Sequence, residues 1–378
     1  MKNNWLSFIS AFGLFFIIGC SSNLKPFQNK GQVSNLSFDE KLIWHQSEEF
    51  EKEAVNGNHI YEDPALEEYL NNILNRLFPD YVDVMRIKIL KSPSYNAFVL
   101  PNGAIYINLG LLAAFENEAQ IASVIGHEGT HFIQKHGAIQ YQSVQSARAM
   151  STLLMGIPIA GLLSVLANTS SIYGYSRKAE LESDHKGFER LVKAGYAPDA
   201  AASAMQKLLI EVKDSKTDEP FFFSSHPKLE KRITLFNKMT KETTSRSNFL
   251  GEKNYQQFIK NILQDSARLQ LEFGRYNSLI SLLSNEQRQQ RYGGIGYYYL
   301  AEAKRKTSAD NDEIIKFYQK AIELSPEFTE THKDLGLYFY KLNKYTEAKN
   351  HLTYYLKNTQ STKELKLVEY YLNKLSKE

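Results

Sequence analysis

Two histidines and a glutamate in the pattern His-Glu-x-x-His are the residues of this chain best suited to chemistry: His127, Glu128 and His131. On an α-helix, residues i and i+4 lie one above the other on the same face, so both imidazoles can bind one metal ion. Glu128 lies beside them, where its carboxylate can take a proton from a water molecule at the metal. The pattern predicts a hydrolytic zinc site; the alternative is a buried helix with two incidental histidines.

A third ligand is expected further along the chain, because catalytic zinc usually has three protein ligands and one open position. Glu180 and Asp184 are four residues apart in a predicted amphipathic helix and share one face of it. Glu180 can complete the metal site, and Asp184 can accept a hydrogen bond from the outer N–H of a ligating histidine. We expect Glu182 to point elsewhere, either solvated or paired with Arg177. The alternative is an ordinary charged helix face.

Two predicted elements must position these side chains. Apolar residues recur with helical spacing at 111–115 and 121–125, which predicts a largely buried helix for the first motif. Ile105 and Ile107 alternate with Tyr106 as they would in a β-strand that precedes this helix.

Both motifs resemble those of the HtpX/CAAX-prenyl-protease family of zinc metallopeptidases (gluzincins). Gly126 precedes the first motif and His136 follows it, and residues 176–184 are similar to the family block S-R-x-x-E-x-E-A-D, with Ser183 in place of alanine. The resemblance implies an α+β, mostly α fold: a zincin-like metallopeptidase domain with a small sheet and one zinc ion as cofactor. The zinc ligands that it implies are His127, His131 and Glu180.

The predicted strand also resembles a segment of that family, through Asn96-Ala97-Phe98 and residues 101–107. In the resembling enzymes this is the edge strand that pairs with an extended substrate backbone. The alternative is an ordinary hairpin that covers the core. The substrate-binding residues that the resemblance implies are Ala104, Ile105, Tyr106 and Ile107.

A further block, Ser224-Ser225-His226-Pro227 followed by Arg232, is similar to the family's S-H-P…R motif. His226 or Arg232 could stabilise the oxyanion of a tetrahedral intermediate. His226 could instead occupy the open zinc position and hold the enzyme inactive. A helix cap at His226, with Arg232 in a salt bridge, is the structural alternative. In the catalytic reading, Glu128 takes the proton of the nucleophilic water and passes it to the leaving amine.

The start of the chain predicts where the protein works. Residues 1–20 combine a basic start, a short apolar stretch and a small residue before Cys20, as in a secretory signal. Ile17-Ile18-Gly19-Cys20 resembles a bacterial lipobox, which implies lipidation of Cys20. No aspartate follows, which by the sorting rule favours the outer membrane. Residues 21–36 are polar and predict a flexible tether. The alternative is an ordinary signal with a chance cysteine, although Cys20 is the only cysteine of the chain.

The rest of the chain divides into a metallopeptidase domain at 37–241 and a helical domain at 250–378. Residues 152–166 are apolar but shorter than a membrane span and contain Pro158, so we favour a core or site-covering helix over contact with the membrane surface. The C-terminal part fits the tetratricopeptide pattern of about 34 residues. A generic helical bundle is the alternative. The positions that carry the last repeat are His332, Leu335, Gly336, Phe339, Tyr345, Ala348 and Leu352.

Composition is that of a globular protein, and a formal net charge of +3 does not suggest a nucleic-acid partner. A lipid or secretory signal combined with C-terminal repeats resembles the periplasmic BepA-like branch of the family. That resemblance implies a lipid-anchored envelope metalloendopeptidase that acts on unfolded or misassembled proteins, with repeats that dock on the outer-membrane assembly machinery. The alternative is a repeat-based chaperone or scaffold whose zinc site is silent or auto-inhibited.

Overall fold

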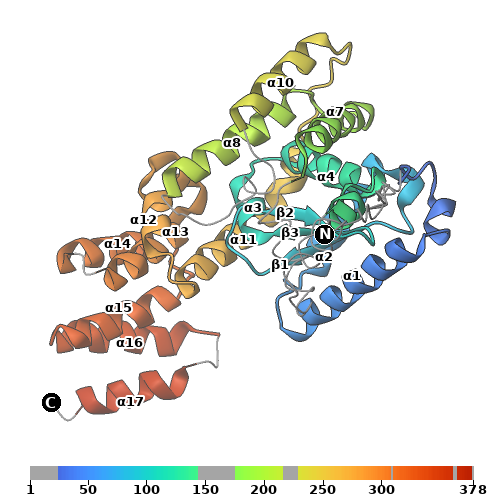
Figure 1. Cartoon of the computed structure of the whole chain (residues 1–378). Helices are drawn as coiled ribbons and strands as arrows, with labels where there is room; N and C mark the ends of the chain where they lie inside the picture. Colours follow the sequence, from blue (N-terminus) through green and yellow to red (C-terminus); the bar gives the residue numbers. More distant parts are fainter. Residues whose placement is uncertain (1–23, 144–174, 216–228, 308–309, 361–363, 377–378) are drawn as a thin grey trace, which may run out of the picture.

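The computed structural model describes residues 24–143, 175–215, 229–307, 310–360 and 364–376. Most of these residues are helical, and one small sheet lies in the N-terminal half (Figure 1). The expected α+β, mostly α class is therefore confirmed. The elements of the N-terminal half are α1 (Phe38–Asn56), α2 (Pro64–Leu77), β1 (Arg86–Leu90), β2 (Ala97–Val99), β3 (Ala104–Asn108), α3 (Leu109–Ala114), α4 (Glu118–Ile133), α7 (Arg177–Lys193), α8 (Ala200–Ser215) and α10 (Leu229–Glu242).

The sheet has the order β1-β3-β2, with β1 parallel and β2 antiparallel to β3. All five residues of β3 are buried, because β3 has a neighbour on each side and helices cover the sheet. The prediction that Ala104–Ile107 form an edge strand is therefore wrong. Alternation of side chains identifies a strand but not its place in the sheet, which depends on pairing between distant residues. Among the described residues, β2 is the edge strand that lies against α4.

Residues 24–36 are not a free tether. The Phe27 side chain is buried, and its backbone N–H donates to the Ile133 carbonyl at the end of α4 over 2.9 Å. Its ring lies 5.3 Å from the Phe132 ring, and the Lys135 ammonium lies 4.1 Å from its centroid. One aromatic residue thus fixes this polar segment to the end of α4, which corrects the predicted flexibility for its described part.

All regular secondary structure of the C-terminal half is helical in the residues that the structure describes. In Figure 1 its last helices lead away from the N-terminal half in a row, with α13 packed on α14, α15 on α16 and α17 on α16. This arrangement is consistent with a helical-repeat domain. The helices are α11 (Glu252–Glu272), α12 (Tyr276–Ser284), α13 (Glu286–Lys306), α14 (Asn311–Leu324), α15 (Glu330–Lys341), α16 (Tyr345–Asn358) and α17 (Leu365–Leu375).

The hydrophobic core does not stop at the expected domain boundary between 241 and 250. One continuous cluster of buried side chains extends from the sheet and α4 through α11, α12 and α13, whereas α14 to α17 pack mainly around a second cluster. Polar contacts cross the same boundary: Tyr255 donates to the Leu112 carbonyl over 2.5 Å, and Arg291 donates to the Phe115 carbonyl over 2.8 Å. The first C-terminal helices therefore share one core with the sheet and α4.

None of the helices formed by the described residues combines the length and the apolar character that a membrane-spanning helix requires. The apolar segment 152–166 and Cys20 lie outside the described residues.

Candidate metal centre

Helix α4 carries the His-Glu-x-x-His motif and is buried along almost its whole length. Its start is well defined, because the Asn117 side chain accepts a hydrogen bond from the Gln120 N–H over 3.0 Å, as an N-cap residue does. The carboxylate of Glu118 is buried in the first turn and accepts hydrogen bonds from Arg76 at 3.1 Å and Tyr196 at 2.6 Å. A carboxylate at a helix N-terminus also suits the helix dipole. These contacts fix the helix before the motif begins.

Helix α7 brings the third carboxylate to α4. Ser176 caps its start by accepting a hydrogen bond from the Ala179 N–H over 3.2 Å. The two helices cross where Gly126 faces Gly187, and a Cβ atom on Gly187 would lie 3.0 Å from the backbone of Gly126 and His127. Only glycine permits such a close approach without a shift of one helix. The crossing places the second motif directly opposite the first.

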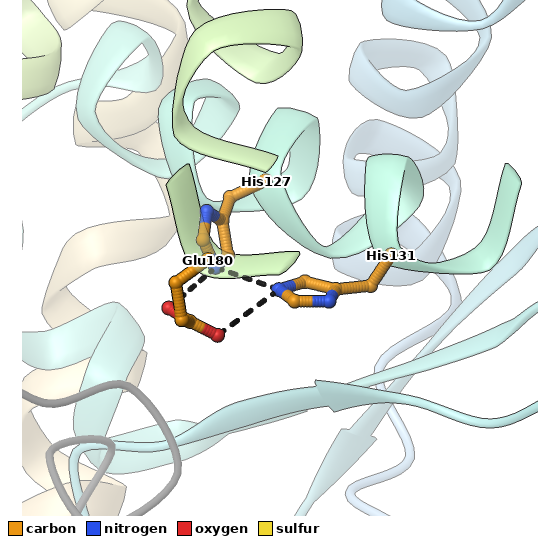
Figure 2. A group of neighbouring side chains, drawn as sticks. All are labelled: His127, His131 and Glu180. Atoms are coloured by element: carbon orange, nitrogen blue, oxygen red, sulfur yellow. Dashed lines mark hydrogen bonds and ion pairs between the residues drawn. The ribbon is translucent and has the colours of Figure 1, made fainter. Parts of the chain in front are cut away.

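Three side chains converge at this crossing: His127 and His131 from α4 and Glu180 from α7 (Figure 2). The Nε2 atoms of the two histidines are 3.0 Å apart. The Glu180 carboxylate oxygens lie 3.6 Å from His127 Nε2 and 3.4 Å from His131 Nε2. All three residues are buried, as a rigid metal site requires.

These distances fit a zinc ion. Tetrahedral zinc with ligand distances of about 2.0–2.1 Å separates neighbouring ligand atoms by about 3.3 Å, and the three observed separations bracket that value. Burial, reinforced by the Arg232 guanidinium, lowers the pKa of His127 to about 4. His127 is therefore neutral at physiological pH, as a metal ligand must be. The set of two imidazoles and one carboxylate is a known ligand set of catalytic zinc sites.

Behind His127, on the side away from Glu180, lies a carboxylate–arginine pair. Asp184 Oδ1 is 3.0 Å from His127 Nδ1, so the expected orienting contact of Asp184 is present. Arg232 of α10 donates to the same carboxylate, through Nε at 3.0 Å and 3.1 Å and through Nη2 at 2.6 Å. Burial alone would raise the pKa of Asp184, but Arg232 and His127 together hold it below its usual value.

This position places Arg232 on the Nδ1 side of His127, and the oxyanion role suggested by the sequence stays a prediction. Its Nη2 lies 3.1 Å from His127 Nδ1, whereas the atom of His127 that faces Glu180 is Nε2. The salt bridge was the structural alternative for Arg232, and that salt bridge is present with Asp184. His226, the other oxyanion candidate, lies outside the described residues.

Behind His131 lies a histidine whose role the sequence did not reveal. His136 Nδ1 is 3.0 Å from His131 Nδ1, and His136 Nε2 is 3.5 Å from Glu182. Glu182 also accepts from Lys186 over 2.7 Å and stays partly exposed, so its partners are Lys186 and His136 rather than Arg177. The only sequence signal was the presence of His136 in the family-like motif. Its five-residue spacing from His131 does not place both on one face of a helix.

Glu128 and Tyr175 complete the surroundings of the three ligands. Glu128 is fully buried on α4 beside His127. The Tyr175 ring stacks on the His131 ring at a centroid distance of 3.9 Å. Burial raises the pKa of Tyr175, and the carboxylates of Glu128 and Glu180 raise it further. The Tyr175 phenol and both carboxylates are therefore close enough to interact, and together they surround the place where a reacting group could meet the expected base, Glu128.

Residues 64–240 match the sequence model of a protein family described as "Peptidase family M48". The mitochondrial metalloendopeptidase OMA1 of Arabidopsis thaliana is 32% identical over 149 residues, which are 39% of this chain and 30% of that protein. The protein of the same name from Schizosaccharomyces pombe is 26% identical over 220 residues (55% and 63%). The beta-barrel assembly-enhancing protease of Escherichia coli K12 is 27% identical over 189 residues (46% and 39%). The chain thus matches less than two thirds of the length of each of these relatives.

The matched segment contains both histidines, Glu128, Glu180, Asp184 and Arg232, and the family expectation from the sequence is confirmed. Residues 64–240, which carry the three converging side chains, are thus similar to peptidase family M48, a family of zinc metallopeptidases.

Proposed function

We propose that this chain is a zinc-dependent endopeptidase that cleaves unfolded or misassembled proteins of the bacterial cell envelope. The observation that carries the proposal is the convergence of three buried donor atoms at the spacing of tetrahedral zinc ligands, with Glu128 beside them. A structural zinc site would close all four positions with protein ligands. Within the described residues, only these three groups meet.

A bound zinc ion would supply a Lewis acid that acidifies water and polarises a carbonyl group. Glu128 is the proposed general base: it takes a proton from the nucleophilic water and later gives it to the leaving amine nitrogen. Asp184 keeps the proton of His127 on Nδ1 and so leaves Nε2 free to bind the metal. Arg232 neutralises and orients Asp184.

The proposed binding site for the substrate backbone is the outer edge of β2. Asn108 N–H donates to the Asn96 carbonyl, and Leu100 N–H donates to the Ala104 carbonyl. In an antiparallel ladder, alternate residues direct their N–H and C=O groups to opposite sides of the strand. Asn96 and Leu100 bond to β3, so the N–H and C=O groups of Ala97 and Val99 face away from it. β2 packs against α4. An extended peptide paired with Ala97 and Val99 would lie along the catalytic helix.

The envelope substrate class and its location are the broader part of the proposal. A relative from Escherichia coli is named for enhancing beta-barrel assembly. The sequence adds the lipobox at Cys20, from which we propose attachment to the periplasmic face of the outer membrane. It also adds the C-terminal helices, which we propose dock on the assembly machinery.

The test is digestion of an unfolded protein such as casein by the full chain, with and without a zinc chelator. Glu128→Gln should bind zinc like the wild type and lose cleavage by about 10²–10⁴-fold, because only proton transfer is removed. Glu189→Gln changes an exposed glutamate of α7 and serves as the matched control. Cleavage by Glu128→Gln at the wild-type rate would exclude the mechanism. A wild-type chain that binds zinc and unfolded protein but cleaves nothing would favour the chaperone alternative.

A further inference from the structure

The two histidines of the metal centre are supported in different ways. Behind His127 lies a carboxylate, Asp184, at 3.0 Å. Behind His131 lies no carboxylate at that distance among the described residues but a third imidazole, His136, with Nδ1 facing Nδ1 over 3.0 Å. Two facing nitrogens can form a hydrogen bond only if one carries a proton and the other does not. This contact therefore restricts the protonation of both rings.

The direction of the hydrogen bond follows from the metal site. His131 presents Nε2 to His127 and Glu180, and a neutral imidazole that binds a metal through Nε2 carries its proton on Nδ1. His131 Nδ1–H is then the donor, so His136 Nδ1 must be the unprotonated acceptor. The proton of neutral His136 is left on Nε2, and that atom lies 3.5 Å from the Glu182 carboxylate.

We propose that His136, held in its Nε2–H tautomer by Glu182, is the positioning residue that fixes His131 as a metal ligand. Glu182 acts on His136 as Asp184 acts on His127, but with one imidazole inserted between carboxylate and ligand. Lys186 donates to Glu182 over 2.7 Å and holds that carboxylate in place.

The backbone after α4 is shaped to make this contact. α4 ends at Ile133, and Lys135 adopts a φ of 57°, in the left-handed region that is uncommon for residues with a side chain. The turn at residues 134–135 interrupts the helix, and His136 Nδ1 lies 3.0 Å from His131 Nδ1 beyond it. Two contacts hold Lys135 in this conformation: its ammonium lies 2.6 Å from Glu40 and 4.1 Å from the centre of the Phe27 ring. Backbone strain of this kind persists only where surrounding contacts maintain it.

Ser183 is a competing partner for the same atom. Its hydroxyl oxygen is fully buried and lies 3.4 Å from His136 Nδ1, farther than His131 Nδ1. The shorter distance assigns His131 as the main partner. Ser183→Ala separates the two partners, because it removes the hydroxyl and leaves both imidazoles in place.

The inference rests on zinc binding by the wild-type chain, which is part of the proposed function. Its test compares the zinc affinity of each variant with that of the wild type. The experiment measures zinc affinity of the full chain by competition with a coloured chelator. His136→Leu removes the acceptor at similar size and should weaken zinc binding by about 10–100-fold, the usual effect of losing such a partner. His136→Asn retains an acceptor near the Nδ1 position and should recover most of the affinity. His185→Ala, an exposed histidine of α7, is the matched control.

Each outcome is decisive. Wild-type affinity in His136→Leu would overturn the inference, as would a loss in Ser183→Ala as large as that in His136→Leu. A merely structural role would make Asn and Leu equally harmful. If His136→Leu does not fold, the nitrogen NMR signals of the zinc-loaded wild type give the answer: His136 must be protonated on Nε2 and not on Nδ1. The opposite tautomer would refute the proposal. Failure of the wild type to bind zinc would refute the proposed function itself.

Discussion

Removal of the Arg232 guanidinium separates a structural role from a catalytic one. Arg232 and Asp184 are 5% and 2% exposed, and three nitrogen–oxygen contacts of 2.6–3.1 Å join them. Arg232→Leu would leave the Asp184 carboxylate buried with His127 as its remaining partner in this group. Breaking a buried ion pair in this way costs about 3–5 kcal/mol, because an uncompensated charge stays out of water. We expect a loss of this size in the free energy of unfolding.

The double variant provides the control. Asp184→Leu alone should also destabilise the protein, because it leaves the guanidinium buried. Arg232→Leu combined with Asp184→Leu removes both charges, and an apolar pair of similar volume is often neutral or stabilising. The changes in the free energy of unfolding should therefore be strongly non-additive, with the double variant more stable than either single variant. Zinc affinity should nevertheless stay low in the double variant, because His127 Nδ1–H has lost Asp184 as its acceptor.

The assay is urea unfolding of the metal-free chain, followed by zinc titration of each refolded variant. Metal-free protein is required so that loss of zinc does not add to the loss of the ion pair. One result would refute the structural role: an Arg232→Leu variant that has the stability and zinc affinity of the wild type but no longer cleaves peptide. Arg232 would then be the oxyanion donor that the sequence motif suggested.

Three further outcomes are expected. Gly187→Val should force α7 away from the Gly126 backbone. We expect a loss of about 1–3 kcal/mol in the free energy of unfolding, measured with urea, and weaker zinc binding, measured by chelator competition. Unchanged zinc affinity would contradict the role of this crossing. A chain that ends after Thr307 should keep its fold, its zinc binding and its cleavage of casein, because α11–α13 complete the core. A chain that ends after Ser245 lacks these helices and should have the circular dichroism spectrum of an unfolded protein. A folded chain ending after Ser245 would show two independent domains. Burial and the nearby His351 lower the pKa of His332 from 6.5 to about 4, so the folded state binds fewer protons than the unfolded state and stability is lost as pH falls from about 6.5 towards 4. His332 is buried, and at about 1.4 kcal/mol per pKa unit we expect a loss of ~2–3 kcal/mol by pH 4.5. His332→Phe, which can still stack on Tyr354, should make the urea midpoint depend less on pH between pH 7 and 4.5.

The metal ligands could be predicted from the sequence because their chemistry is written in local spacing. His127 and His131 are one helical turn apart, and Glu180 and Asp184 are also one turn apart on a second helix. Each pair is fixed by the 3.6-residue period alone. The crossing of the two helices is a tertiary feature, and in retrospect its sequence signal was the pair of glycines at 126 and 187.

The missed features depend on contacts between distant residues or on a single unusual backbone angle. Which of the strands is the edge strand is decided by pairing, and the alternation of Ile105, Tyr106 and Ile107 does not reveal that β3 is central. Phe27 lies in a polar segment, and nothing nearby predicts its packing on Phe132. His136 returns to the site only because Lys135 is left-handed, whereas a helix continued through Lys135 would have turned it away.

The way in which the C-terminal helices join the peptidase half bears on how a docked partner could present a substrate. Leu250 accepts a hydrogen bond from the Ala119 N–H in the first turn of α4, and Gly251 packs against Glu118 in the same turn. α11 begins immediately afterwards, and Tyr255 is bonded to the Leu112 carbonyl. A flexible linker would let the C-terminal helices sample many orientations, but here the connection is made through α4 itself. Under the proposed function, a protein docked on α14–α17 would therefore be presented to the outer edge of β2 through α11–α13, which pack on the peptidase core. That arrangement would favour substrates whose unfolded segments reach the edge from one side.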